Sequence, residues 1–160
     1  SGEALEEYKK LMLKLNNEVV AAAPEDLLIN THVCRGNYHS TFFSSGAYDS
    51  VADLLFGEEN VNAYYLEYDD ERSGGFAPLA KVSGDKKVVL GLVTTKTPAL
   101  ENKEIVINRI HEAAKYVPLD RLYLSPQCGF ASCEIGNKLT EEEQWAKLKL
   151  VKEIAEEVWG

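Results

Sequence analysis

The sequence lacks several features that would assign it to a particular class of protein. No apolar run approaches the roughly 18 residues that a membrane span needs, and the N-terminal SGEALEEYKK contains no signal-type apolar stretch. Its 17 Lys and Arg against 26 Asp and Glu give a net charge of −9, whereas nucleic acids and anionic membranes bind concentrated basic faces. We therefore expect a cytoplasmic protein with neither a nucleic acid nor a membrane as partner.

Cysteines are few and phosphate-binding motifs are missing. The three cysteines are an odd number and do not make a disulfide framework, so each thiol is expected to be reduced: a ligand, a nucleophile or a small buried residue. No G-x-G-x-x-G follows the first predicted strand and no G-x-x-x-x-G-K-[ST] is present, which argues against nucleotide binding. With 45% apolar residues, residues 1–160 suit a single domain, and Ser1-Gly2 are either its native start or the remnant of an expression tag.

Helical and strand patterns alternate along the chain. Apolar residues spaced by three or four predict a helix over Glu3–Val20 that packs on another element. Four apolar strands follow, which we read as four strand-plus-helix units: helical patterns follow the first, third and fourth strands, a polar loop follows the second, and the last helix has a capping box at its start. The predicted strands are Leu27–Cys34, Val61–Glu67, Lys87–Val93 and Asp120–Ser125, and the helices lie at Tyr48–Phe56, Ile105–Val117 and Thr140–Val158. This order predicts a parallel α/β sheet, either open and doubly wound or part of a (β/α)₈ barrel.

The carboxyl ends of the predicted strands carry residues that bind metals. His32 and Cys34 are two apart at the end of the first strand, so they point to the same side of the sheet. Glu67 ends the second strand and Cys128 follows the fourth, and parallel strands bring such ends to one face. One imidazole, one carboxylate and two thiolates suit tetrahedral zinc. The pattern alone leaves open that these are ordinary buried or solvated side chains.

Four motifs at these strand ends resemble the C-terminal catalytic barrel of cobalamin-independent methionine synthase. They are T-H-V-C-R-G-N (31–37), L-E-Y-D-D-E-R-S-G (66–74), G-L-V-T-T-K-T-P-A-L-E (91–101) and L-S-P-Q-C-G-F (124–130). They occur in the family's order and are most similar to its short, methionine synthase II-like members. The resemblance extends from Leu27 to the final helix but covers only the second half of the barrel, so we expect four βα units of a TIM barrel.

The resemblance implies a zinc-dependent methyltransferase. Its zinc ligands would be His32, Cys34, Glu67 and Cys128, and its substrates would be a thiol such as homocysteine and a methyltetrahydrofolate donor. The physical chemistry agrees, because coordination by a Lewis acid deprotonates a thiol of pKa about 8.5 while leaving it nucleophilic. Cys133 is expected to be structural rather than a ligand, since four ligands are already present.

Lys96 departs from the family pattern. Long synthases have roughly D-I-H-S-P after the third strand, where the histidine is the proposed proton donor to the folate nitrogen, and this chain has T-T-K-T-P at 94–98. An exposed lysine, with a pKa near 10.4, is a poor general acid at neutral pH. Lys96 is therefore a candidate catalytic residue whose alternatives are solvation or contact with an anionic group of the substrate, and the methyl donor need not be a folate.

Because the resemblance covers only half a barrel, several functions remain possible for the chain. The chain is expected to be an enzyme fragment that needs a first half, with a non-catalytic zinc-binding module as the alternative. A corrinoid-linked thiol methyltransferase is a further alternative, and a decarboxylase of the uroporphyrinogen type fits less well because it needs no zinc ligands. Since half a barrel has two unpaired strand edges, we expect the chain to self-associate or to pair with the missing N-terminal half.

Overall fold

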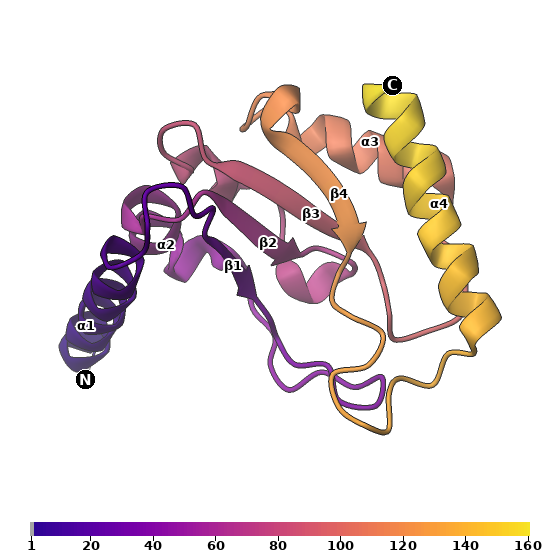
Figure 1. The fold of residues 1–160 in the computed structure, drawn as a ribbon, viewed down its shortest axis with the longest axis horizontal. Coiled ribbons are helices and arrows are strands. Elements are labelled where there is room, and N and C mark those ends of the chain that lie inside the picture. Colours follow the sequence, from indigo (N-terminus) through magenta and orange to yellow (C-terminus); the bar gives the residue numbers. More distant parts are fainter. Residues whose placement is uncertain (1) are drawn as a thin grey trace.

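A computed structural model describes residues 2–160, and its centre is a four-stranded parallel sheet with strand order β1-β2-β3-β4 (Figure 1). Ser1 lies outside the described residues, so the expectation about its origin stays open. The strands are β1 (Asn30–Val33), β2 (Ala63–Glu67), β3 (Lys87–Val93) and β4 (Leu122–Pro126). The α-helices are α1 (Gly2–Ala21), α2 (Ala52–Glu58), α3 (Lys103–Ala113) and α4 (Glu141–Trp159), with short 3-10 turns between them.

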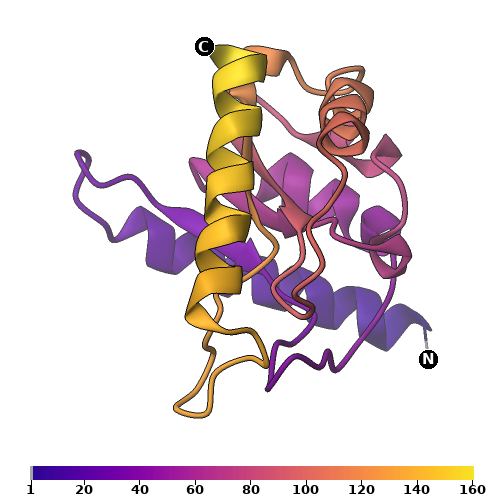
Figure 2. The same cartoon turned by 90° about the vertical axis from the view of Figure 1, so that its right-hand side faces the viewer.

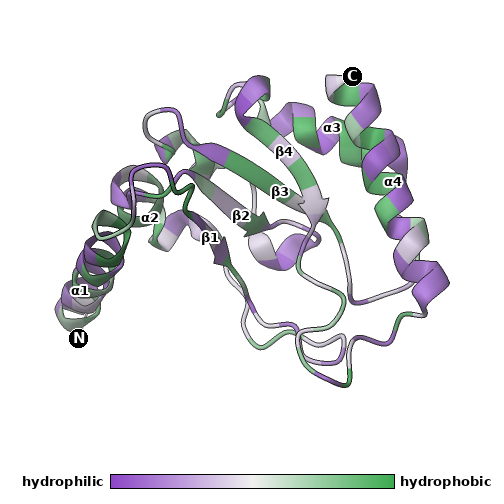
Figure 3. Ribbon diagram, in the orientation of Figure 1, coloured by the Kyte–Doolittle hydropathy of each residue, from purple (hydrophilic) through white to green (hydrophobic). Residues whose placement is uncertain are grey.

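The sheet is packed on one face and open on the other. Alternate residues of the strands, among them Tyr64, Leu90 and Leu122, are fully or almost fully buried in one apolar core with α2, α3 and α4. The run over β3 is apolar along most of its length (Figure 3) and buried from its second residue onward. On the opposite face Tyr65 and Tyr123 each remain 40% exposed. The predicted α/β fold with parallel strands is confirmed.

Helices α1 and α4 lie at opposite ends of the sheet (Figures 1 and 2). The capping box predicted for α4 is present, because the Thr140 hydroxyl accepts a hydrogen bond from the Glu143 backbone and the Glu143 side chain accepts one from the Thr140 backbone. Lys147 fastens α4 to the segment after β3: its buried ammonium donates to the Ala99 carbonyl at 2.7 Å and to the Glu101 carboxylate at 3.1 Å. None of the described helices is long and apolar enough to cross a bilayer.

Two elements differ from their predictions: the first helix in its burial and the first strand in its starting residue. Helix α1 forms almost where the periodicity placed it, but none of its residues is buried and the stripe that includes Leu5, Leu15 and Val19 is exposed. It is attached by polar contacts such as that of Asn17 with the Glu58 carbonyl, and by Val20, which packs against the edge of the core. Strand β1 begins at Asn30 rather than Leu27, because the neighbouring strand begins pairing only at Ala63, the partner of Asn30.

Two long loops meet beyond the carboxyl ends of the strands (Figure 1). One follows β1 and the other follows β4. The backbone N–H of Ser40 in the first donates to the side chain of Asn137 in the second at 3.1 Å, and the Lys138 N–H donates back to the Ser40 hydroxyl at 2.8 Å. His39 and Ser40 have positive φ angles of 44° and 66°, so the first loop turns sharply where it meets the second. The contact holds together the two segments that follow Cys34 and Cys128.

Candidate metal centre

The structure brings His32, Cys34, Glu67 and Cys128 together. Their candidate ligand atoms all lie within 4.8 Å of one another, although the residues come from three different strand ends. His32 lies in β1 and Cys34 directly after it, Glu67 is the last residue of β2, and Cys128 is two residues beyond β4. Alternation in a strand and the shared direction of parallel strands thus produce the cluster that the sequence predicts.

The cluster fits a tetrahedral zinc ion. Zinc bonds of about 2.0–2.3 Å to nitrogen, oxygen and sulfur require ligand atoms about 3.3–3.8 Å apart. Cys34 Sγ and Glu67 Oε1 are 3.5 Å apart, and all four ligand atoms lie within 4.8 Å of one another, about 1 Å beyond the separation that zinc requires. The donor set of two sulfurs, one nitrogen and one oxygen also matches the preference of zinc. These four residues are therefore the ones that could hold a metal.

The two ligand thiols have opposite protonation tendencies. A hydrogen bond with His32 lowers the pKa of Cys128 to about 7, and the same contact raises the pKa of His32. Burial raises the pKa of Cys34 to about 11, and its thiol lies against the Glu67 carboxylate. Without a metal, Cys128 is thus the more acidic thiol, and Cys34 retains the proton that a metal would displace.

Glu67 is fully buried and is held from both sides. Its Oε2 accepts the Arg35 backbone N–H at 3.0 Å, with the Arg35 and Arg72 guanidinium groups 4.0 and 3.7 Å away. Its Oε1 accepts the side-chain amide of Gln127 at 3.1 Å. Tyr48 fixes the adjacent backbone, since its hydroxyl accepts the Glu67 N–H at 2.9 Å. Burying a carboxylate without such partners would carry a large desolvation cost.

Gly91 lets the three strands approach closely at this point. A Cβ at Gly91 would lie 2.6 Å from the Leu66 carbonyl oxygen and 2.7 Å from Gln127 Cα, distances at which the backbone would have to move. Gly91 pairs with Glu67 on one side and Ser125 on the other. The absence of a side chain therefore allows the segment of Gln127 to lie against the Glu67 carboxylate.

Sequence reasoning missed the residues that support Glu67. Arg35 and Gln127 each adjoin a predicted ligand, Cys34 and Cys128 respectively, and that adjacency is the one signal in the sequence that could have found them. Tyr48 lies in a 3-10 turn before α2, far from the ligands in the sequence, and no pattern marks it. The three supporting contacts depend on the tertiary structure rather than on spacing.

Lys96 does not join the cluster. Its ammonium nitrogen is enclosed and makes no hydrogen bond within residues 2–160, and Lys96 does not line the cavity beside the candidate ligands. The acidic group nearby is Asp69, whose pKa burial raises while Thr94, Arg72 and Lys96 act to lower it. Lys96 therefore acts electrostatically on Asp69, which follows β2, and is not one of the clustered candidate metal ligands.

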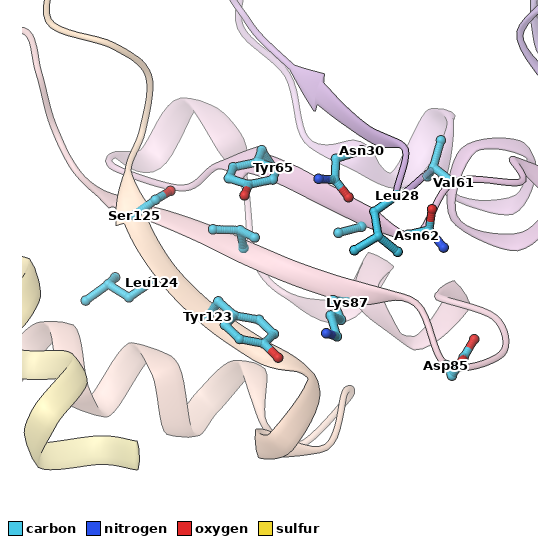
Figure 4. A pocket seen from close by; sticks show the side chains of 12 residues that line it. Leu28, Asn30, Val61, Asn62, Tyr65, Asp85, Lys87, Tyr123, Leu124 and Ser125 are labelled. Carbon is cyan, nitrogen blue, oxygen red and sulfur yellow. The ribbon is translucent and has the colours of Figure 1, made fainter. Parts of the chain in front are cut away.

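Two cavities lie on the open face of the sheet. The smaller, of about 300 Å³, adjoins the metal cluster and is lined by His32, Cys128 and the neighbouring parts of β2 and β4. The larger, of about 670 Å³, extends along the sheet toward the amino ends of the strands. Figure 4 shows Asn30, Tyr65 and Tyr123 projecting into it from three strands. Tyr65 and Ser125 line both cavities, so the two lie next to each other on this face, and the smaller one reaches the metal cluster.

The fold and the cluster together define a class of protein: half of a (β/α)₈ barrel whose strand ends carry a thiolate-rich candidate metal centre. The comparisons make this specific. Residues 12–157 match the model of the cobalamin-independent synthase catalytic domain, and the chain belongs to this family. The resemblance of the four strand-end motifs is confirmed.

Individual relatives agree with the family assignment. The chain is 53% identical over 159 residues to the uncharacterized protein YxjG of Bacillus subtilis, covering 99% of this chain and 42% of YxjG. It is 24% identical over 157 residues to a 5-methyltetrahydropteroyltriglutamate–homocysteine methyltransferase of Bacillus licheniformis, covering 97% of this chain and 18% of that enzyme. A solved Listeria monocytogenes protein, provisionally a vitamin-B12-independent methionine synthase, superimposes with a TM-score of 0.73 at 42% identity, over 95% of this chain and 41% of the other. The chain thus spans about two fifths of the length of YxjG and of the Listeria monocytogenes protein.

Proposed function

We propose that the chain supplies the metal-binding half of a zinc-dependent methyltransferase that moves a methyl group from a methyltetrahydrofolate-type donor to a thiol such as homocysteine. The observation that carries this proposal is the meeting of two thiols, an imidazole and a carboxylate at the carboxyl ends of barrel strands in a member of this family. When bound, zinc would act as a Lewis acid that keeps the acceptor sulfur deprotonated at neutral pH.

The protein's own residues prepare this chemistry. Cys34, Glu67 and Cys128 provide three negative charges once both thiols are ionised, so a bound acceptor sulfur would retain electron density instead of being strongly polarised. Arg35 and Gln127 hold the Glu67 carboxylate, and the cavity of about 300 Å³ beside Cys128 offers space for a small thiol. Lys96 stays a candidate for contact with an anionic substrate group or for proton transfer.

The isolated chain is proposed to lack turnover. The sheet face that carries the two cavities is open to solvent in the described part of the chain, since Tyr65 and Tyr123, which line the larger cavity, are each 40% exposed. YxjG of Bacillus subtilis and the solved Listeria monocytogenes protein are each more than twice its length. The remaining barrel strands would then supply the rest of the substrate site and would exclude water from the methyl transfer. We also propose a cytoplasmic location, as for other enzymes of small-molecule metabolism.

A methyl-transfer assay tests the proposal. The parent protein that contains both barrel halves should methylate homocysteine from methyltetrahydrofolate only when loaded with zinc, and the 160-residue chain alone should not. If the parent binds zinc but accepts methyl groups only from a methyl-corrinoid, the zinc assignment stands and the folate donor is wrong. A parent that binds no zinc and transfers no methyl group would contradict the proposal.

A further inference from the structure

A chain of buried hydrogen bonds links the candidate metal ligand Glu67 to both loops that follow the ligand cysteines. Gln127 Nε2 donates to Glu67 Oε1 at 3.1 Å. Gln127 Oε1 accepts two hydrogen bonds from Thr95, one from its backbone N–H at 3.1 Å and one from its hydroxyl at 2.7 Å. Glu67, Thr95 and Gln127 are each at most 1% exposed, so water does not replace these partners.

The Thr95 contacts fix the direction of the Gln127 amide. A backbone N–H can only donate, so the Gln127 atom that faces Thr95 has to be the carbonyl oxygen. The amide nitrogen is then left to point at Glu67 Oε1, which accepts its hydrogen bond. This is the same oxygen that lies 3.5 Å from Cys34 Sγ, and it therefore faces the position of a metal.

The series of hydrogen bonds continues from Thr95 into the two loops. The Thr95 hydroxyl accepts contacts at 3.4 Å from the amides of Asn37 and Asn137, and the Asn137 amide also donates to the Thr95 carbonyl at 2.7 Å and to Asn37 Oδ1 at 3.0 Å. Asn37 donates to the Gly129 carbonyl at 2.8 Å, next to Cys128. The loops that carry the two candidate ligand thiols are thus tied to each other through the same group that orients Gln127.

We propose that Gln127 is a positioning residue, which holds the Glu67 carboxylate oxygen toward the metal, and that Thr95 sets the direction of its amide. The inference rests on the metal site of the proposed function and deepens it. Outer partners of metal ligands commonly contribute 10- to 100-fold to metal affinity because they fix the orientation of the ligand. Gln127 would act in this way on Glu67 while the next residue, Cys128, is itself a ligand.

Zinc affinity of the 160-residue chain, measured by competition with a chromophoric chelator, tests this role without an activity assay. Gln127→Met keeps the length of the side chain but removes the donor, and should weaken zinc binding about tenfold or more. Gln144→Met, the same change at the chain's other glutamine on α4, should bind zinc like the unmodified chain. Thermal unfolding of the metal-free variants checks that each one folds.

Two substitutions at Thr95 separate positioning from packing. Thr95→Ser keeps the hydroxyl and loses a methyl group, whereas Thr95→Val keeps the shape and loses the hydroxyl. Positioning predicts that the serine variant binds zinc like the unmodified chain and that the valine variant binds more weakly. The reverse order would show a packing role and overturn the inference, as would unchanged affinity in both Gln127→Met and Thr95→Val. If the unmodified chain itself binds no zinc, the metal site of the proposed function fails, and this inference fails with it.

Discussion

At the scale of single residues, the candidate metal centre combines what spacing predicts with what only folding creates. The four candidate ligands could be predicted because their positions follow from strand alternation and from the shared direction of parallel strands. Gln127 is marked only by its place beside Cys128, and its hydrogen bond to Glu67 depends on the close approach of the strands at Gly91, which the sequence does not show. Tyr48 lies in a turn before α2, and no pattern predicts its hydrogen bond to Glu67. The sequence places ligands on one face, and tertiary contacts orient them.

The three cysteines should contribute unequally to metal binding. Cys34→Ser and Cys128→Ser each remove a sulfur from the cluster and should lower zinc affinity by at least about 100-fold, since a hydroxyl is a far weaker zinc ligand than a thiolate. Cys133→Ser is the matched control, because Cys133 lies outside the cluster. Chelator competition on the purified variants measures the effect, and equal losses in all three would show that the ligands were assigned wrongly.

At the scale of secondary-structure elements, nearly every helix and strand could be predicted from the sequence. The errors concern which face of a helix is buried and where a strand begins. Helix α1 forms as its apolar periodicity predicts, yet the apolar stripe is exposed. Periodicity shows that one face of a helix is apolar, but it does not show which element covers that face. The Leu27–Leu28 segment is apolar but unpaired, since strand formation requires a neighbour with matching register. Local sequence therefore determines the elements, and pairing determines their ends.

Helix α1 is attached to α2 through a buried carboxylate that costs stability. Glu59 is 2% exposed; its Oε1 accepts the Asn16 amide at 3.0 Å, and its Oε2 has no hydrogen-bond partner within residues 2–160. Burial raises the pKa of Glu59 above its ordinary value. The folded state therefore binds the proton more tightly than the unfolded state, and Glu59 weakens folding as the pH rises through its raised pKa.

Glu59→Gln should consequently stabilise the protein at neutral pH. The glutamine still accepts from Asn16 but carries no buried charge, so we expect a gain of about 1 kcal/mol, or roughly 2–4 °C in melting temperature, at pH 7. The gain should shrink as the pH falls and disappear near pH 4, where the wild-type carboxyl is protonated in both states. Glu58→Gln on the exposed side of α2 is the control. Melting curves measured from pH 4 to 8 that show a pH-independent difference would contradict this account.

At the scale of the whole molecule, four parallel strands and the helices that pack on them form a coherent core but not a closed barrel. Strands β1 and β4 each pair on one side only within residues 2–160, and the open face of the sheet exposes Tyr65 and Tyr123. The chain covers about two fifths of the length of relatives such as YxjG and the solved Listeria monocytogenes protein. The half-barrel architecture followed from the order of elements and the four motifs, whereas the surface that the other strands would cover became visible only in the structure.

The isolated chain should therefore associate. Unpaired strand edges next to an exposed apolar face favour pairing with another chain, either a second copy or a separately supplied first half of the barrel. We expect sedimentation at micromolar concentration to show dimers or larger species, and co-expression with the first half to give a 1:1 complex at the expense of self-association. A compact monomer with one cooperative thermal transition, unaffected by the first half, would show that the four-stranded sheet is complete by itself.

The central claim is that His32, Cys34, Glu67 and Cys128 form one zinc site, and X-ray absorption at the zinc K-edge of the zinc-loaded chain tests it most directly. The cluster predicts one zinc per chain with two sulfur neighbours at about 2.3 Å and two nitrogen or oxygen neighbours at about 2.0–2.2 Å. Cys128→Ser should reduce the sulfur count to one and Cys133→Ser should leave it at two. A first shell with three sulfurs, or with none, would contradict the site.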